Sequence, residues 1–478
     1  MDLQWISARK MLTCERIDLM AKYTYVEHKE RGFNMKWADE LYLRHIEAFS
    51  GGNFSEPGNE NKNSIEAYRE TFDELCEVMR NNQFDSNISN IPCSTEFVIG
   101  DGAHRVAAAA YFNRELPCSI VDKKMPVYDY AFFLSHYLEP VFCDYMLTKY
   151  VEMKKENVYV ICIWPRGMVQ KESLTKIDGI IREECRVIGY KETKMSYQGL
   201  KNFMIQCYAN QEWMGGIDTR FRGVEGKVDP CYEKNGKVGV YVVELNNPKT
   251  TSIVELKARL RQYFGLENHS LHSSDTVEES IRMVHLLFNQ NSLHILNNAK
   301  LDYDMDAFNR ISQLKQRILQ EEKSLERYVI DSSTVMSIYG IRKSRDLDYI
   351  TVDDCSEDFH LKDIDCHNSA LKYYKMDASE IVMNPRNYGY VFDMKIITLP
   401  VLMKFKETRG EKKDLDDVKL IKQRISNTQS LKNSLEVHLI QLGRFFRNFR
   451  TKIRDILQKH NIYFFTKLWH LIRGKGFK

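Results

Sequence analysis

Two runs of β-forming residues, set apart by helical stretches, constrain the fold of this chain more than any other feature. Val158–Trp164 and Val238–Leu245 consist mostly of β-branched and aromatic residues, and Pro165 ends the first run. Helices are expected at about 174–186, 196–210, 255–264 and 277–288. This order of strands and helices predicts an α+β sandwich, in which helices cover a β-sheet.

The length of the chain predicts several domains. At 478 residues it exceeds what one hydrophobic core usually serves, so about two to four domains are expected. The expected fold class is α+β and multidomain. We expect an α/β domain at 1–150, the sandwich, of the ferredoxin-like kind, at 151–305, a second α/β domain at 306–425 and a basic helical tail at 426–478.

Charge and cysteine content exclude some classes of protein. The formal net charge is only +3, so the chain as a whole has no polyanion-binding signature, and any such preference must come from a local patch. Eleven cysteines occur without a Cys-x-x-Cys pair, which argues against a disulfide framework or a structural zinc site and favours a reducing cytoplasm. Neither a signal peptide nor a run of about 18 apolar residues is recognisable, so a soluble or peripheral protein is expected.

The segment Asp101-Gly-Ala-His-Arg105 is the first of three candidate phosphate-binding loops. A short strand is expected at 97–102 and an Ala-rich helix at 106–112, so the segment opens a helix. Unpaired N–H groups and the positive end of the helix dipole attract anions there, and the Arg105 guanidinium can hold a phosphate through two hydrogen bonds. The alternative is an ordinary turn in which His104 and Arg105 pair with nearby acids.

The same segment resembles the nucleotide loop of the ParB/sulfiredoxin-like superfamily, where Gly and polar residues precede an Arg and an Ala-rich helix. The Asp-Gly-x-His-Arg form is typical of members that handle ATP or ADP rather than DNA, and the resemblance covers about residues 15–125. It implies that a nucleotide's phosphates contact Asp101, Gly102, His104 and Arg105.

The second candidate loop is Asn268-His-Ser-Leu-His-Ser-Ser-Asp-Thr276, which precedes the helix expected at 277–288. A phosphoryl-accepting histidine needs one free ring nitrogen, a partner that orients the other nitrogen, and cations that neutralise the transferred group. His272 is the candidate nucleophile. Its expected orienting partners are Ser274, Asp275 and Glu279.

This loop resembles the active-site segment of nucleoside diphosphate kinases, in which a His-Gly-Ser-Asp step precedes a Glu-rich helix. The resemblance covers about residues 156–295 and implies a ferredoxin-like fold with phosphoryl transfer through His272. The alternative is a kinase-like fold that serves as a binding or structural module, with His272 inert.

The kinase resemblance extends to residues outside the loop. It implies that Tyr208 stacks against the nucleotide base and that Arg259 or Arg261 binds a phosphate. Where the family has Lys-Pro-Asp, this chain has Trp164-Pro165-Arg166, so Arg166 is the candidate substitute for the lysine. Arginine and lysine are not equivalent donors at such a site.

The third candidate loop begins at Ser332 and leads into Asp346-Leu-Asp348. The pattern predicts a polar turn, a helix and then a strand, and residues two apart on a strand face the same side. Asp346 and Asp348 are therefore expected to chelate Mg²⁺, which would clamp the phosphates of a nucleotide. Ser332 and Ser333 are expected to hydrogen-bond those phosphates at the start of the helix. The alternative is a solvated strand edge.

An Asp-x-Asp after a turn of small residues resembles the nucleotidyltransferase superfamily, here over about residues 325–425. The segment Lys404–Asp417 resembles the Lys…Arg…Lys-Asp…Asp segment that closes many of its smaller members. The resemblance implies Mg²⁺ and ATP or another nucleoside triphosphate, together with a third carboxylate. Candidates for that carboxylate are Asp365, Asp377 and Asp393.

The tail from Gly443 to Lys478 differs in composition from the rest of the chain. It carries ten Lys or Arg and a single acid, Asp455, interleaved with aromatic residues. Such a stretch can form a basic amphipathic helix on an anionic membrane surface, where each basic residue contributes about 1 kcal/mol. Packing against the preceding domain is an equal alternative, and binding to nucleic acid ranks below both.

Three loops that resemble phosphate-handling families favour an enzyme. The order of the three resembles proteins of bacterial or viral surface-glycan gene sets. It implies a cytoplasmic, Mg²⁺-dependent enzyme, at most peripheral to the inner membrane face, that transfers a nucleotidyl or phosphoryl group to a sugar or alcohol precursor. Two alternatives stay open: a non-catalytic nucleotide-sensing or scaffold protein with degenerate transferase folds, and a toxin-like nucleotidyltransferase that modifies RNA or protein.

Overall fold

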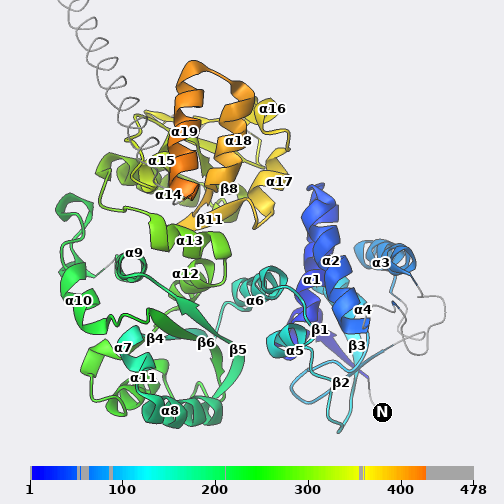
Figure 1. Cartoon of the computed structure of the whole chain (residues 1–478). Helices are drawn as coiled ribbons and strands as arrows, with labels where there is room; N and C mark the ends of the chain where they lie inside the picture. The colour runs from blue at the N-terminus through cyan, green and yellow to red at the C-terminus, as the bar shows by residue number, and fades with distance from the viewer. Residues whose placement is uncertain are drawn as a thin grey trace, which may run out of the picture. The chain divides into compact units, whose positions relative to one another are not determined.

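The structure, a computed structural model, describes residues 3–50, 54, 64–84, 90–209, 211–354, 359 and 361–426. The chain forms two compact units, Met1–Thr398 and Leu399–Lys478. The first unit contains three separate β-sheets with helices around them, so the mixed α and β fold class predicted from the sequence is confirmed (Figure 1). None of the described helices is long and apolar enough to cross a membrane. The basic tail at 443–478 lies outside the described residues.

The region up to Lys154 is mainly helical. Its helices are α1 (Asp18–Arg31), α2 (Met35–Ser50), α3 (Ile65–Arg80), α4 (Ala103–Tyr111), α5 (Tyr130–Ser135) and α6 (Pro140–Lys154), with a 3-10 turn η1 (Ala8–Met11). Its sheet has the strand order β1-β3-β2, from β1 (Gln4–Ser7), β2 (Ile91–Cys93) and β3 (Glu115–Ile120). The central strand β3 pairs antiparallel with β1 and parallel with β2.

The Ala-rich helix predicted at 106–112 is confirmed as α4, whereas the strand predicted at 97–102 is wrong. Ile99 makes only an isolated bridge with Cys93. Phe97 has a positive φ of 63°, which interrupts an extended run. Ser94 closes the turn by accepting hydrogen bonds at its hydroxyl from the N–H groups of Glu96 and Val98.

The middle region is built on a four-stranded sheet. Its strands are β4 (Val158–Ile163), β5 (Cys185–Lys194), β6 (Lys237–Leu245) and β7 (Leu271–Ser273). Their order is β5-β6-β4-β7, and all neighbours are antiparallel. The helices are α7 (Pro165–Met168), α8 (Lys171–Glu184), α9 (Tyr197–Cys207), α10 (Val224–Cys231), α11 (Ile253–Gln262), α12 (Val277–Leu287) and α13 (Gln290–Asn298). Short 3-10 turns are η2 (Glu212–Met214), η3 (Ile217–Thr219) and η4 (Glu267–His269).

Apolar side chains on the sheet explain why helices cover it. Figure 1 shows α8 and α11 along one face of the sheet and α9 and α12 along the other. The core on the α8 and α11 side includes Ile161, Ile163, Ile177, Ile181, Tyr241, Val243, Leu256 and Leu260. Both strands and all four helices predicted here are confirmed. The sequence did not predict β5 or β7.

The third region contains a five-stranded mixed sheet. Its strands are β8 (Tyr328–Asp331), β9 (Leu347–Thr351), β10 (Ile364–Cys366), β11 (Tyr388–Val391) and β12 (Met394–Ile397), in the order β10-β9-β8-β12-β11. The pairs β8–β9 and β11–β12 are antiparallel, and β9–β10 and β8–β12 are parallel. The helices are α14 (Met305–Gln320), α15 (Ser332–Ile338), α16 (Leu371–Tyr374) and α17 (Ala378–Met383), with the turns η5 (Leu325–Arg327) and η6 (Asn368–Ala370).

The second unit contributes the described helices α18 (Leu399–Arg409) and α19 (Lys412–Ser426). Buried ion pairs join them: Lys406 Nζ lies 3.1 Å from Asp414 and 3.0 Å from Asp417. The guanidinium of Arg409 donates two further hydrogen bonds of 2.7 Å to Asp414. The charges of the segment Lys404–Asp417 therefore neutralise one another within this unit.

Candidate functional site

Three neighbouring strands of the third region bring aspartates to matching positions. Asp331 on β8 pairs with Asp348 on β9, and Asp348 pairs with Asp365 on β10. Residues paired across adjacent strands face the same side of a sheet, so the three carboxylates form a row on one face. Asp346 lies two residues before Asp348, immediately before β9 begins, and we call these four residues the aspartate row.

The base of the aspartate row is held in place by hydrogen bonds. Asp331 is fully buried and accepts hydrogen bonds from the Ser332 N–H, at 2.5 Å, and from the Tyr374 hydroxyl. His367 Nδ1 lies 2.6 Å from Asp331 Oδ2. The Ser333 hydroxyl donates to Asp346 Oδ1 at 3.0 Å, so this serine fixes a carboxylate.

Burial, together with neighbouring acids, changes the ionisation of Asp348. Burial raises the pKa of this carboxyl, and the negative charges of Asp331 and Asp346 raise it further, while His367 and the Ser332 hydroxyl act in the opposite direction. Among the described residues, no Lys or Arg forms an ion pair with any member of the aspartate row. The row therefore combines closely spaced acids with little neutralising charge.

The structure distinguishes the three candidates for a third carboxylate. Asp365 lies in the row beside Asp348 and is exposed. Asp377 caps α17 and accepts a hydrogen bond from the Asn34 side chain. Asp393 is bound by Arg282, at 2.6 Å, and by Lys315. Only Asp365 of these three is placed to act with Asp346 and Asp348.

His272 lies on β7, within the segment Asn268–Thr276, and is 5% exposed. Its Nε2 is 2.8 Å from Glu279 Oε1 on α12, so Glu279 is the orienting partner. No hydrogen-bond partner of Nδ1 is found in the part of the chain that the structure describes. Burial raises the pKa of Glu279, but the hydrogen bond and charge of His272 outweigh this and lower it. Ser274 instead bonds to the Val160 N–H at 2.9 Å.

Aromatic residues surround His272, and the nearby cations already bind protein groups. The ring of Tyr208 meets the imidazole edge-on at 4.9 Å, and Trp164 stacks parallel to it at 6.2 Å. Arg261 donates to the Leu271 carbonyl at 3.1 Å. The remaining cations and their partners are Lys257 with Asp275, Lys227 with the Asn268 carbonyl, Arg259 with Glu184, and Arg166 with Glu233. Tyr208 is thus brought to His272, whereas Arg259 and Arg166 point to other partners.

The loop Asp101–Arg105 forms the start of α4. Gly102 is the N-cap residue with φ at 83°, and a side chain there would lie 2.5 Å from Ile91 and 2.8 Å from Arg105. Arg105 donates to Asp101 at 3.0 Å and to the Asn90 carbonyl at 3.2 Å. His104 Nε2 contacts the Tyr42 hydroxyl at 2.8 Å. In this structure the arginine pairs with the aspartate of its own loop.

A further set of polar residues escaped the sequence-based interpretation. Among the described residues, the group of three acidic, histidine or cysteine side chains whose ligand atoms all lie within 4.8 Å of one another is Glu152, His285 and Glu326. The sequence gives no ligand spacing for His285 or for His367, so both histidines would be interpreted from it as structural. The residues that these histidines contact come from segments far apart in the chain, so no local sequence pattern predicts the contacts. For Asp331 the sequence does give a local signal, because Asp331 directly precedes Ser332, where the third candidate loop begins.

Comparison with known proteins finds no matching family model, no similar curated protein and no similar solved structure.

Proposed function

We propose that this chain is a Mg²⁺-dependent nucleotidyltransferase that acts on a hydroxyl group of a sugar or alcohol precursor, with ATP or another nucleoside triphosphate as donor. The observation that carries the proposal is the aspartate row, in which Asp331, Asp348 and Asp365 occupy paired positions on three neighbouring strands. Four acids with no Lys or Arg ion pair among the described residues form a site to which a divalent cation supplies the missing charge.

The chemistry of the donor set fits Mg²⁺. Carboxylate oxygens are the ligands this ion prefers, and it usually takes one or two of them together with phosphate oxygens. Asp346, Asp348 and Asp365 would hold it, and it would neutralise the charge of the bound phosphates. These side chains must still rotate to meet at one point, because their oxygens do not form a preassembled group within 4.8 Å.

The residues of the chain have distinct roles in this proposal. Ser333 positions Asp346 through the hydrogen bond between their side chains, at 3.0 Å. Asp331, held by His367 and Tyr374, places a fixed negative charge behind Asp348. In the reaction, the acceptor hydroxyl gives its proton to water or to a carboxylate of the aspartate row as its oxygen attacks the α-phosphorus. The bond between the α-phosphorus and the oxygen that bridges it to the β-phosphorus breaks, and diphosphate leaves with that oxygen.

The strand connections support the finer fold assignments on which the proposal draws. In the middle region, β4 and β5 are joined by α8 and lie on either side of β6, as in the split β-α-β arrangement of ferredoxin-like folds. In the third region β8, α15 and β9 follow one another, and β10 extends the sheet, which supports a nucleotidyltransferase-like unit. We assign the loop Asp101–Arg105 to a ParB/sulfiredoxin-like unit and the tail 443–478 to an anionic membrane surface on sequence alone.

A second activity, phosphoryl transfer through His272, is favoured by one observation. Its Nε2 is held by Glu279 while no described residue occupies Nδ1, and this is the arrangement a phosphoryl-accepting histidine requires. The surrounding cations nevertheless bind the protein itself, and His272 is 5% exposed. The aspartate row therefore remains the main proposal.

The experiment uses each of the four nucleoside triphosphates, labelled in turn at the α- and the γ-phosphorus. The protein, Mg²⁺ and the small-molecule fraction of a cell extract are incubated together, and products are separated by chromatography. The variant is Asp348→Asn. The matched control is Asp363→Asn, because Asp363 is an exposed acid near the row whose positive φ of 60° suits asparagine.

Each outcome has a defined meaning. An α-labelled product together with diphosphate, lost in Asp348→Asn and kept in Asp363→Asn, is the expected result. A γ-label on the protein that disappears in His272→Gln would move the activity to the second site. If neither label moves with any nucleotide, while both proteins are folded by circular dichroism, the transferase proposal fails and a binding function replaces it.

A further inference from the structure

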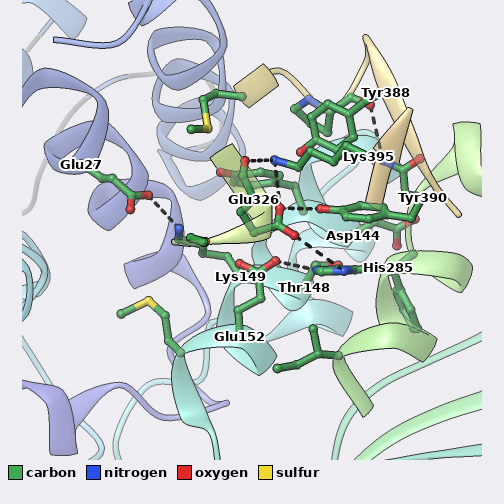
Figure 2. Close-up of a pocket in the computed structure, with 18 of the residues that line it drawn as sticks. Glu27, Asp144, Thr148, Lys149, Glu152, His285, Glu326, Tyr388, Tyr390 and Lys395 are labelled. Atoms are coloured by element: carbon green, nitrogen blue, oxygen red, sulfur yellow. Dashed lines mark hydrogen bonds and ion pairs between the residues drawn. The ribbon is translucent and has the colours of Figure 1, made fainter. Parts of the chain in front are cut away.

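A cavity of about 560 Å³ lies within the first unit, away from the aspartate row. Helices α1, α6 and α12 and strands β11 and β12 contribute to its wall, and Figure 2 shows charged side chains and tyrosines from these elements pointing into it. Sequence segments from all three regions of the unit meet here. None of the residues assigned to nucleotide or phosphate binding lines it.

Three side chains on the cavity wall have the composition of a metal-binding group. His285 on α12 lies with Nε2 2.7 Å from Glu152 Oε1 on α6 and with Nδ1 4.0 Å from Glu326 Oε1 on η5. One ligand atom from each residue lies within 4.8 Å of the other two. An imidazole nitrogen with two carboxylate oxygens suits divalent ions such as Zn²⁺ and Mn²⁺.

Contacts with neighbouring side chains hold Glu326 in one orientation, as the residues around a metal site hold a metal-binding side chain. Its Oε2 accepts a hydrogen bond from the Tyr390 hydroxyl at 2.8 Å and lies 2.9 Å from Lys395 Nζ. These donors leave Oε1 facing His285, whose ring stacks on Tyr390 at 4.0 Å (Figure 2). Such outer contacts fix the direction of a metal ligand and tune its basicity.

The Glu326 oxygen that lies toward His285 has no hydrogen-bond donor among the described residues. The other carboxylate oxygen of Glu326 has two partners. About one third of the Glu326 side chain, 33%, is accessible to water, and this residue lines the cavity. The cavity thus gives an entry path and room for water or a ligand on a bound ion.

We propose that Glu152, His285 and Glu326 bind a divalent transition-metal ion whose open coordination positions face this cavity. The negative charge is local to the cluster: among the described residues, the carboxylates of Glu152 and Glu326 have one lysine in ion-pair contact, Lys395, so one negative charge is left when His285 is neutral. The wider cavity wall carries more Lys and Arg than Asp and Glu, so only this local charge favours a cation. The proposal does not rest on the transferase activity, because it shares no residue with the aspartate row.

A proton is the competing occupant. Burial lowers the pKa of His285, but the charges of Glu326 and Glu152 outweigh burial and raise it. A protonated imidazole bridging two glutamates would therefore also satisfy the cluster. A metal ion and this proton compete for the same imidazole, so binding of the metal must release the proton.

The test uses the full-length chain with Asp346→Asn and Asp348→Asn as background, so that the aspartate row does not add binding. Equilibrium dialysis with Zn²⁺, in excess Mg²⁺, measures stoichiometry, and Co²⁺ is followed by its visible absorption. We expect one ion per chain. Glu152→Gln and Glu326→Gln are expected to weaken binding by about 100-fold or more, and Tyr390→Phe by about tenfold.

Glu279→Gln is the matched control, because His272 and Glu279 also form a histidine–glutamate pair, at 2.8 Å, outside the cavity. Its Zn²⁺ stoichiometry and affinity should equal those of the background protein. Binding that survives both Glu152→Gln and Glu326→Gln, or no binding at all, would overturn the proposal. So would a nitrogen NMR spectrum in which both nitrogens of His285 stay protonated at pH 7.5 with saturating Zn²⁺.

Discussion

Two groups of aspartates in this chain have opposite surroundings. In the second unit, Asp414 and Asp417 are buried against Lys406, and Arg409 also binds Asp414. In the first unit, Asp348 stands between other acids on a sheet face, and the charge of His367 acts to lower its pKa.

The pKa shifts record this difference. Burial raises the pKa of both carboxyls, but the hydrogen bonds and charges of Arg409 and Lys406 outweigh it and lower the pKa of Asp414. For Asp348, acids add to the effect of burial, and the pKa stays raised. An acid whose charge the chain neutralises has a lowered pKa in the folded state, so its charged form favours folding. Acids that have no Lys or Arg beside them are the ones to which a cation can bind.

The largest contrast is expected from replacing Asp348. Asp348→Asn should lower nucleotidyl transfer by about 10³-fold, equivalent to about 4 kcal/mol of transition-state stabilisation. The free energy of unfolding should stay unchanged or rise, because a carboxylate crowded by acids is removed. Steady-state assays and urea unfolding of the same preparation measure both quantities. A variant that loses stability as well as activity would make Asp348 a structural residue.

Asp414 should show the reverse behaviour. Asp414→Asn leaves the buried Lys406 without one of its partners and should cost about 3 kcal/mol of stability. Transfer activity per folded molecule should not change. Hydrogen exchange of peptides from α18 and α19 measures the loss, and Lys412→Gln, at an exposed position, should stay within about 0.5 kcal/mol of wild type. Equal protection in Asp414→Asn and wild type would refute the comparison.

Low pH should remove the effects of both aspartates on folding stability, which have opposite signs at neutral pH. The lowered pKa of Asp414 means that its stabilisation is present above its unfolded pKa of about 3.9 and is lost as pH falls through the folded value. The raised pKa of Asp348 means that its charged form disfavours folding, and this cost disappears as pH falls through the folded value to below about 3.9. Asp414→Asn should therefore destabilise, and Asp348→Asn stabilise, only at higher pH.

Urea unfolding at a series of pH values, followed by hydrogen exchange, checks this prediction. The wild-type-minus-variant difference should shrink toward zero for both variants near pH 3, with opposite signs at pH 7. Two differences of the same sign at pH 7 would mean that the surroundings of these aspartates are more alike than the structure indicates.

The elements that the sequence predicts well are those with a dense local pattern. β4 and β6 are central strands with continuous apolar runs, and these runs are recognisable in the sequence. β5 was missed because it is an edge strand: its second half, Tyr190–Lys194, is largely polar, and no breaker separates it from α8. β7 has three residues, too few for any period to emerge.

The candidate site was predictable only in its local part. The spacing of Asp346 and Asp348 predicts that both lie on one strand; in the structure Asp348 lies on β9 and Asp346 immediately precedes it. The choice of Asp365 over other acids depends on the pairing of β9 with β10, which no local pattern contains. The same holds for His285, whose acidic neighbours lie on α6 and η5, far from it along the chain.

The smallest expected effect is stabilisation by Mg²⁺, and one experiment measures it for both groups of aspartates. An ion that binds only the folded state adds RT ln(1 + [L]/Kd), which is about 1.4 kcal/mol at tenfold excess over Kd. Wild type should therefore gain about 1 kcal/mol in 10 mM Mg²⁺, measured as a shift of the urea midpoint of β9 peptides. Peptides of α18 and α19 should not respond, because Lys406 and Arg409 of α18 already neutralise Asp414 of α19. Asp348→Asn should abolish the gain and Asp363→Asn should keep it.

Since added salt also screens charges, the same ionic strength of NaCl is the control. A gain that Asp348→Asn retains would place the ion elsewhere and remove the reason for treating the aspartate row as a cation site.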